Sequence, residues 1–312
     1  MTDIIGNVKM NLQFYTGEDS YNDGDIEDEI LQLVKTTANN PLEIAKVLAQ
    51  DSRWPVLYHL SSQRLNLLDW YSFDPNGRVL EIGAGCGALT GLLCEKTQQV
   101  IAVELSKRRA EIIGNRHRNQ KNLEVVVGNL NDIQLQQQFD YVTLIGVLEY
   151  AGKFTTSSSP FHQFLLKIKE FIEDDGTLII AIENKYGLKY WAGAREDHTG
   201  RIFDSLENYR SHEQDLGVAT FSNHELRNLL TETGFKDIEF YYPMPDYKMP
   251  VAIYTDDFSP SPGSFAPNTD SYDQDRFLLF NEERTAKGIT ETGQFGFFAN
   301  SFLVFCKKGE AE

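Results

Sequence analysis

Apolar residues in the first 75 positions recur at helical spacing. Between residues 25 and 37 they are Ile26, Ile30, Leu31 and Val34. Intervals of three and four residues place such side chains on one face of a helix. Pro41 suits the first turn of a second helix, and a third is expected from about Trp54 to Tyr71. Residues 1–24 are polar and acidic, so we interpret residues 1–75 as a loose or extended arm followed by a helical cap.

From residue 78 onwards short apolar runs alternate with helical segments. The predicted strands are Arg78–Ile82, Gln99–Glu104, Leu123–Val127, Phe139–Gly146, Thr177–Ile182, Ile238–Tyr242 and Ser301–Cys306. The predicted helices are Ala88–Lys96, Ser106–Gln120, Phe161–Glu173, and one that begins at the capping-box pattern of Ser222 and Glu225 and ends near Gly234. This alternation predicts a Rossmann-like α/β fold with a doubly wound, mostly parallel sheet.

A glycine-rich turn follows the first predicted strand of this sheet. Gly83, Gly85 and Gly87 let the backbone bend sharply and approach a ligand, because no Cβ intrudes. The amides of the helix that follows point towards such a ligand. Glu104 ends the next strand about 20 residues later, where a carboxylate can accept both hydroxyl hydrogens of a ribose. The pattern predicts a nucleotide-like cofactor, which could be NAD or S-adenosylmethionine (SAM).

Two details favour SAM. Ala88 stands where the dinucleotide fingerprint has its third glycine, and Glu81 could meet a cationic amine or sulfonium. The stretch from Arg78 to Gly87 also resembles the first motif of class I SAM-dependent methyltransferases, and Glu104 matches the acidic residue after their second strand. The resemblance covers residues 56–243 and 301–308. A glycine turn without a ligand is the plainer alternative.

The resemblance implies further features. It implies a seven-stranded sheet whose last strand is antiparallel beside the fifth. In the resembled family the turn after the third strand contacts the adenine; here Asn129 would bond its amine and Leu130 would pack on the ring. Gly146 and Glu149 lie in a segment that resembles the fourth motif, next to the transferable methyl group. Alternatively, Glu149 is a surface residue at a strand end.

Two long insertions, at about 184–220 and 244–300, interrupt the expected methyltransferase domain of residues 76–308. Loops of this length are usually functional. The tract from Glu183 to Gly200 is rich in aromatic, acidic and imidazole groups, and it resembles methyltransferases associated with bacterial cell-surface polysaccharide synthesis.

The first insertion also supplies candidate bases for a methyl acceptor. His198 is the first candidate because its pKa lies near neutrality; Asp197 or Glu196 could orient it or act instead. Glu149 is a rival base. His198 could also simply hold its loop by hydrogen bonds, and an amine acceptor, deprotonated on its own, needs no dedicated base.

Composition narrows the choice of acceptor and compartment. The net charge of −17 repels phosphate backbones, so no nucleic-acid partner is expected. The sequence contains no run of 18 or more apolar residues, so no membrane span is expected, and no secretory signal is recognised. The three cysteines are widely separated, which suits a reducing cytoplasm. No metal-ligand pattern is recognised, so no metal is expected.

The sequence therefore predicts a SAM-dependent methyltransferase acting on oxygen or nitrogen of a small-molecule or sugar-containing acceptor. The alternatives are a peptide or protein methyltransferase, an NAD-dependent oxidoreductase, and a non-catalytic SAM-binding module that supports a glycosyltransferase. A homo-oligomer is left open.

Overall fold

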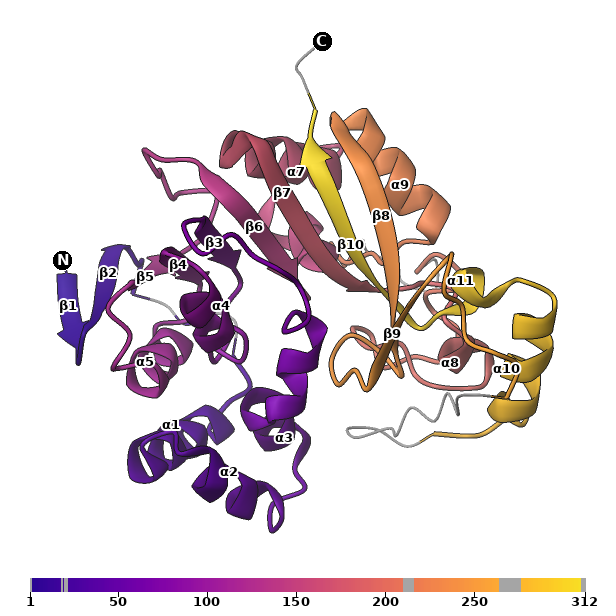
Figure 1. Cartoon of the computed structure of the whole chain (residues 1–312), viewed down its shortest axis with the longest axis horizontal. Coiled ribbons are helices and arrows are strands. Elements are labelled where there is room, and N and C mark those ends of the chain that lie inside the picture. Colours follow the sequence, from indigo (N-terminus) through magenta and orange to yellow (C-terminus); the bar gives the residue numbers. More distant parts are fainter. Residues whose placement is uncertain (1, 18, 20–21, 210–215, 264–275, 310–312) are drawn as a thin grey trace. The chain divides into compact units, whose positions relative to one another are not determined.

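The computed structural model of the chain describes residues 2–17, 19, 22–209, 216–263 and 276–309 (Figure 1). They belong to two units, each with its own contacts: Met1–Ile145 with Glu170–Thr177, and Gly146–Lys169 with Leu178–Glu312. None of the helices in these stretches combines the length and the apolar character that crossing a bilayer would require.

The first unit contains most of the parallel sheet. Its elements are β1 (Thr2–Ile5), β2 (Val8–Phe14), α1 (Ile26–Thr37), α2 (Pro41–Leu48), α3 (Trp54–Leu60), the 3₁₀ helix η1 (Ser62–Leu67), β3 (Arg78–Ile82), α4 (Thr90–Lys96), β4 (Gln99–Glu104), α5 (Lys107–Arg116), β5 (Leu123–Gly128) and β6 (Phe139–Ile145). The strand order is β1-β2-β5-β4-β3-β6. β3 is parallel to both β4 and β6, with Leu80 opposite Ile101 and Val142, so the central strands are apolar and covered.

The N-terminal residues, expected as a loose or extended arm, include two strands of the sheet. β1 and β2 form an antiparallel hairpin, and β2 runs parallel to β5 with Met10 opposite Val125. Val8 and Met10 are buried, whereas Lys9 between them is exposed. This alternation is typical of a strand with one covered face, and the hairpin therefore widens the sheet.

The helical cap forms as expected at α1 and α2, but the third helix is divided. α3 ends at Leu60 because Ser61 is extended, with φ −66° and ψ 131°, and the chain continues as η1. A hydrophobic core joins the cap to α5 and to the glycine turn; its buried members are Ile30, Leu31, Val34, Ile44, Val56, Leu60, Cys86 and Ile112. The helical cap therefore packs directly against the glycine turn at Cys86.

The second unit contains the C-terminal strands. Its elements are η2 (Leu148–Tyr150), α6 (Ala151–Phe154), α7 (Pro160–Glu170), β7 (Ile172–Glu183), α8 (Leu188–Trp191), α9 (Asn223–Glu232), β8 (Phe235–Met244), β9 (Ala252–Thr255), α10 (Glu282–Glu291), α11 (Phe295–Phe298) and β10 (Ser301–Lys308). The ends of α7 and β7 nearest residue 171 belong to the first unit. The order is β7-β10-β8-β9, and β10 is antiparallel to β8, on which α9 packs (Figure 1).

Two expectations about the strands need correction. The described residues form ten strands rather than seven, because β1, β2 and β9 are additional. Residues 174–176, which separate the predicted helix Phe161–Glu173 from the predicted strand Thr177–Ile182, lie within β7. By contrast, the Ser222 capping box is present: the Ser222 side chain bonds the Glu225 amide, and the Glu225 side chain bonds the Ser222 amide.

The two insertions contain short elements of their own. Residues 184–220 include α8, and residues 244–300 include β9, α10 and α11. Parts of both, residues 210–215 and 264–275, lie outside the described residues. The domain boundaries at residues 75 and 308 stay a prediction.

Candidate functional site

The glycine turn of the first unit has the backbone that its sequence predicts. The φ angles of Gly83, Gly85 and Gly87 are +68°, +56° and +75°, a region that side chains with a Cβ rarely adopt. A Cβ added at Gly85 would meet nothing within 4 Å, so this face of the turn is open. The residues of the turn therefore leave room for a ligand close to the backbone.

Glu104 binds the turn from the next strand. One carboxylate oxygen accepts the Gly85 amide at 2.8 Å, and the other accepts the Ser106 amide at 2.9 Å. Burial raises the pKa of Glu104, although both amides favour its ionised form. Each carboxylate oxygen has about two acceptor positions, so one position on each stays available for a ribose hydroxyl. The turn and Glu104 thus fit the adenosyl group of a nucleotide-like cofactor.

Residues behind the turn hold it in place. The Arg116 guanidinium donates to the carbonyl oxygens of His59 at 2.6 Å and Cys86 at 3.2 Å. The His117 Nε2 bonds the Gly87 carbonyl at 2.8 Å, and burial lowers the pKa of His117 to about 3. His117 is therefore neutral near pH 7, and it leaves little room for a Cβ at Gly87, which would lie 3.0 Å from Nε2.

The other residues predicted to contact the cofactor differ in burial and in bonding. The Glu81 carboxylate is buried and accepts the Thr90 hydroxyl at 2.6 Å; burial raises its pKa to about 7. Asn129 and buried Leu130 directly follow β5, the neighbour of β4, and the Asn129 side chain accepts the Asn131 amide. Gly146 belongs to the second unit, with φ +70°, and a Cβ there would lie 2.9 Å from the Tyr247 hydroxyl.

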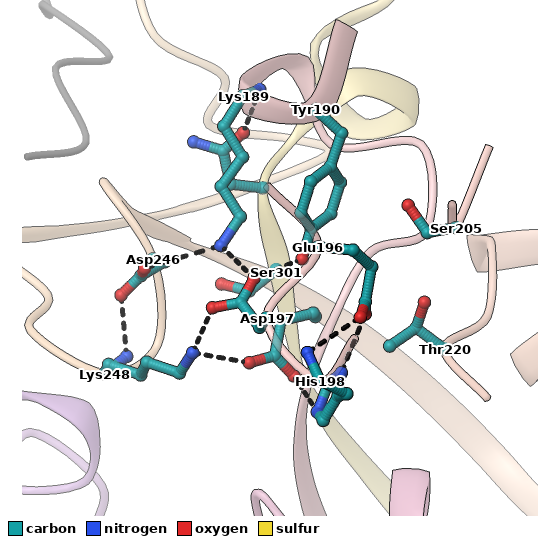
Figure 2. Close-up of polar contacts among 12 residues, drawn as sticks. Lys189, Tyr190, Glu196, Asp197, His198, Ser205, Thr220, Asp246, Lys248 and Ser301 are labelled. Atoms are coloured by element: carbon teal, nitrogen blue, oxygen red, sulfur yellow. Dashed lines mark hydrogen bonds and ion pairs between the residues drawn. The ribbon is translucent and has the colours of Figure 1, made fainter. Parts of the chain in front are cut away.

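Three predicted catalytic residues of the second unit belong to one group of charged side chains. We call this group the acidic cluster; it consists of Glu149, Glu183, Lys189, Glu196, Asp197, His198, Asp246 and Lys248. Its members come from η2, the end of β7, the first insertion and the start of the second. Figure 2 shows six of them.

Asp197 is the most fully bonded member of the acidic cluster. It accepts hydrogen bonds from Lys189 at 2.9 Å, from Lys248 at 2.5 Å and from the Tyr190 hydroxyl at 2.5 Å (Figure 2). Burial alone would raise the pKa of Asp197, but the two lysines outweigh it and hold that pKa well below its usual range. Asp197 is therefore an ionised anchor for the ammonium groups of buried Lys189 and partly buried Lys248.

His198 is fixed by its neighbour Glu196. The His198 Nδ1 lies 2.7 Å from a Glu196 oxygen (Figure 2). The other Glu196 oxygen accepts the amides of His198 and Thr199. The Tyr209 hydroxyl donates to Glu196 at 3.1 Å. Burial would lower the pKa of His198, but the surrounding glutamates outweigh it and hold that pKa well above 6.5. The imidazole is therefore oriented rigidly, with Nε2 directed away from Glu196.

Glu149 and Glu183 lie on the Nε2 side of His198. Nε2 is 3.8 Å from Glu149 Oε1 and 4.0 Å from Glu183 Oε2. Glu183 Oε1 pairs with Lys248 at 2.8 Å and accepts the Tyr247 hydroxyl at 3.2 Å. Within the part of the chain that the structure describes, the Oε2 atoms of both glutamates are buried and have no hydrogen-bond partner. Burial raises the pKa of Glu149, whereas Lys248 and His198 outweigh burial and lower that of Glu183.

Sequence reasoning found Glu149, Asp197 and His198, but it did not select Glu183 or Lys248. A signal for Glu183 was present: it ends a buried strand, as Glu104 does. Lys248 carried no such signal, because its contacts with Asp197 and Glu183 join distant segments of the chain.

The parallel sheet, the open glycine turn and Glu104 define an α/β protein that binds a nucleotide-like cofactor. A family model described as a methyltransferase domain matches residues 56–239, more than half of the chain. The chain therefore belongs to the methyltransferase domain family. It is a SAM-dependent methyltransferase, and SAM rather than NAD is its cofactor.

The chain is also similar to individual proteins. An uncharacterized methyltransferase of Staphylococcus carnosus (strain TM300) is 28% identical over 202 residues, which are 61% of this chain and 91% of that protein. Ribosomal RNA small subunit methyltransferase A of Geobacter metallireducens is 32% identical over 75 residues, 24% of this chain and 27% of that protein. The solved phosphoethanolamine N-methyltransferase 1 of Haemonchus contortus is 13% identical, with a TM-score of 0.49, covering 91% of this chain and 49% of that one.

Proposed function

We propose that the protein transfers the methyl group of SAM to oxygen or nitrogen of a small-molecule or carbohydrate-like acceptor, and that the acidic cluster binds this acceptor. The observation that carries the proposal is the pair of buried, unpartnered oxygens on Glu149 and Glu183. A buried polar atom without a partner costs about 1–3 kcal/mol. An acceptor hydroxyl or amine that donates to these oxygens would remove that cost.

The bonding of the acidic cluster decides which residue meets the acceptor's proton. Asp197 is occupied by two lysines and Tyr190, and Glu196 is occupied by four donors. Glu149 has a free oxygen and, within the described part of the chain, pairs with no lysine. We therefore assign Glu149 as the general base, in preference to His198 and Asp197.

In the proposed reaction SAM supplies the methyl group, and side chains of the acidic cluster remove the acceptor's proton and orient the acceptor. When bound, SAM supplies an electrophilic methyl group and leaves as S-adenosylhomocysteine. Glu149 takes the acceptor's proton as the acceptor's lone pair forms the new bond to the methyl carbon. Glu183, held by Lys248 and Tyr247, accepts a second hydrogen bond and orients the acceptor. His198 keeps Glu149 in position, and Asp197 holds the two lysines.

Aromatic residues of the insertions support a carbohydrate-like acceptor. Tyr186 and Phe297 stack with ring centroids 5.5 Å apart, and Phe297 and Trp191 are partly exposed. Flat aromatic faces in the insertions suit a ring that has apolar faces and hydroxyl edges. The resemblance to methyltransferases of bacterial cell-surface polysaccharide synthesis points the same way, whereas the net charge of −17 disfavours an RNA acceptor.

The proposed cofactor contacts are those predicted from the sequence. Gly83, Gly85 and Gly87 would line the adenosyl group and Glu104 would bind the ribose, supported by the open turn. Glu81 would meet the amine, Asn129 and Leu130 the adenine, and Gly146 would lie near the methyl group.

A coproduct assay tests the proposal. Purified protein with SAM is offered nucleotide sugars, free sugars, small amines and peptides, and S-adenosylhomocysteine is measured. We expect release with a sugar-containing or small-molecule acceptor, and a loss of about 10²–10⁴-fold in Glu149→Gln with unchanged binding of S-adenosylhomocysteine. Asp257→Asn, an exposed acid outside the cluster, is the matched control.

Two outcomes would contradict the proposal. Release only with peptides would favour a protein methyltransferase. Tight binding of S-adenosylhomocysteine without methyl release to any acceptor would favour a non-catalytic module.

A further inference from the structure

We propose that Glu149, Glu183 and His198 form a binding site for one divalent metal ion. Each offers one ligand atom, and these atoms lie within 4.8 Å of one another. Among the described residues, these three are a group of histidine and acidic side chains with the spacing that a single ion requires. The sequence did not suggest this site, because its members are separated by 34 and 15 residues.

The distances from His198 to the two glutamates are typical of atoms that bind the same metal ion, and they are too long for hydrogen bonds. His198 Nε2 lies 3.8 Å from Glu149 Oε1 and 4.0 Å from Glu183 Oε2, beyond hydrogen-bond range. Zinc–ligand bonds of about 2.1 Å place ligand atoms about 3.4 Å apart at a tetrahedral angle and about 4.2 Å apart across the ion. The two separations from His198 lie between these limits, so an ion fits His198 and either glutamate with small side-chain movements.

Unpartnered atoms provide a second, independent indication. Glu149 and Glu183 are each only 1% exposed, and the Oε2 atom of each has no hydrogen-bond partner among the described residues. The second oxygen of Glu183 is already paired with Lys248. Each glutamate thus retains a buried acceptor oxygen that a cation would satisfy.

The surroundings of His198 also match those of a metal ligand. A metal-binding histidine usually donates its other ring N–H to a carboxylate, which fixes the tautomer. Here Nδ1 lies 2.7 Å from Glu196, and Nε2 faces Glu149 and Glu183. When Nδ1 donates to Glu196, the lone pair of Nε2 is directed towards the proposed ion.

The charge of the acidic cluster favours a cation. Its five carboxylates outnumber the two lysines and one histidine, even with the imidazole protonated. Lys189 and Lys248 are engaged with Asp197, which leaves the side occupied by Glu149 the least compensated. A divalent ion would neutralise most of this excess.

The ligand set indicates the kind of ion. Imidazole suits transition metals and zinc, whereas calcium and magnesium prefer oxygen ligands throughout. One imidazole with two carboxylates therefore favours Mn²⁺, Fe²⁺ or Zn²⁺. If the acceptor binds here, a step that rests on the proposed function, the ion would bind one oxygen of Glu149 and act as a Lewis acid on an acceptor oxygen, while the other oxygen of Glu149 takes the acceptor's proton. Binding of the ion itself does not rest on that step.

Metal titration of the full chain tests the inference. Chelator-treated protein is titrated with Mn²⁺ by electron paramagnetic resonance and with Zn²⁺ by calorimetry. We expect one ion per chain, at least tenfold weaker binding in both Glu149→Gln and Glu183→Gln, and about 10–100-fold weaker binding in Glu196→Gln, which loses the carboxylate that orients His198. Asp257→Asn should bind as the unaltered chain does.

Circular dichroism of each variant checks that it is folded. Glu149→Gln is the decisive variant, because no lysine of the described residues forms an ion pair with Glu149. Absence of Mn²⁺ and Zn²⁺ binding, or equal affinity in folded Glu149→Gln and the unaltered chain, would overturn the inference.

The same protein separates this inference from the proposed function. Methyl release is measured with and without a chelator. Methyl transfer without any metal binding would overturn the metal site and leave the proposed function standing. Stoichiometric metal binding without methyl release to any acceptor would overturn the proposed function and leave the metal site standing.

Discussion

The glycine turn of the first unit and the acidic cluster of the second differ in what determines their geometry. The turn is made by neighbouring residues whose backbone angles follow from glycine, and Glu104 binds it through main-chain amides. The cluster is made by side chains from distant segments, and each depends on the charges of the others. A local substitution should therefore change the turn locally, whereas effects in the cluster should differ greatly between residues of the same chemical type.

The sharpest test of this difference compares two carboxylates of the acidic cluster. Asp197→Asn leaves Lys189 and Lys248 without their shared partner, so we expect the free energy of unfolding to fall by about 3–5 kcal/mol. Glu149→Gln removes a carboxylate that has an unpartnered oxygen, so we expect a change of no more than about 1 kcal/mol. Urea denaturation followed by circular dichroism measures both. Equal losses would mean that the cluster responds to total charge and not to individual bonds.

A buried acid of the first unit should respond to pH in a simple way. Burial raises the pKa of Glu81 to about 7 in the folded chain, above the ordinary value of 4.5. Between these values the unfolded chain loses the proton first, so folding becomes less favourable as pH rises through this window. Glu81→Gln removes the effect. We expect its stability relative to the unaltered chain to increase by about 1.4 kcal/mol per pH unit, to roughly 3 kcal/mol, and then to stay constant above pH 7.

Urea unfolding of both proteins between pH 4 and pH 8 provides the measurement. A stability difference that is the same at pH 5 and pH 8 would show that Glu81 does not titrate differently on folding.

The smallest effect should distinguish two glycines of the turn. Alanine in this backbone conformation costs about 1–2 kcal/mol at either position. Gly85→Ala should show only this strain, because its Cβ meets nothing, but it should weaken binding of S-adenosylhomocysteine at least tenfold. Gly87→Ala should lose more stability, because its Cβ approaches His117. Calorimetry and thermal unfolding measure the two properties. Full cofactor affinity in Gly85→Ala would place the ligand away from the open face.

The parts of the fold that sequence could predict are those encoded by adjacent residues. The ranges of β3 and β4 coincide with the expected ones, because each is a short apolar run next to a glycine or an acid. The Ser222 capping box is equally local. β2 was missed because its alternation is brief and its partner β5 lies more than 100 residues away.

In the acidic cluster, too, the sequence could predict the candidate residues but not the contacts between distant segments. The chemical types at Glu149, Asp197 and His198 suggested catalysis, but their bonding depends on Lys248, which lies 51 residues after Asp197. No local pattern could tell that Asp197 is fully engaged whereas Glu149 keeps a free oxygen. For this reason the sequence proposed a base but could not choose among the candidates.

The packing of Cys86 among the helices of the cap has a practical consequence for anyone dissecting this enzyme. Expression of residues 76–308 alone would remove the apolar partners of Cys86 and Ile112 and the carbonyl that anchors Arg116. Such a fragment would keep every residue of the glycine motif and still lose the scaffold that shapes it. A shortened version for crystallisation or engineering should therefore retain the N-terminal helices.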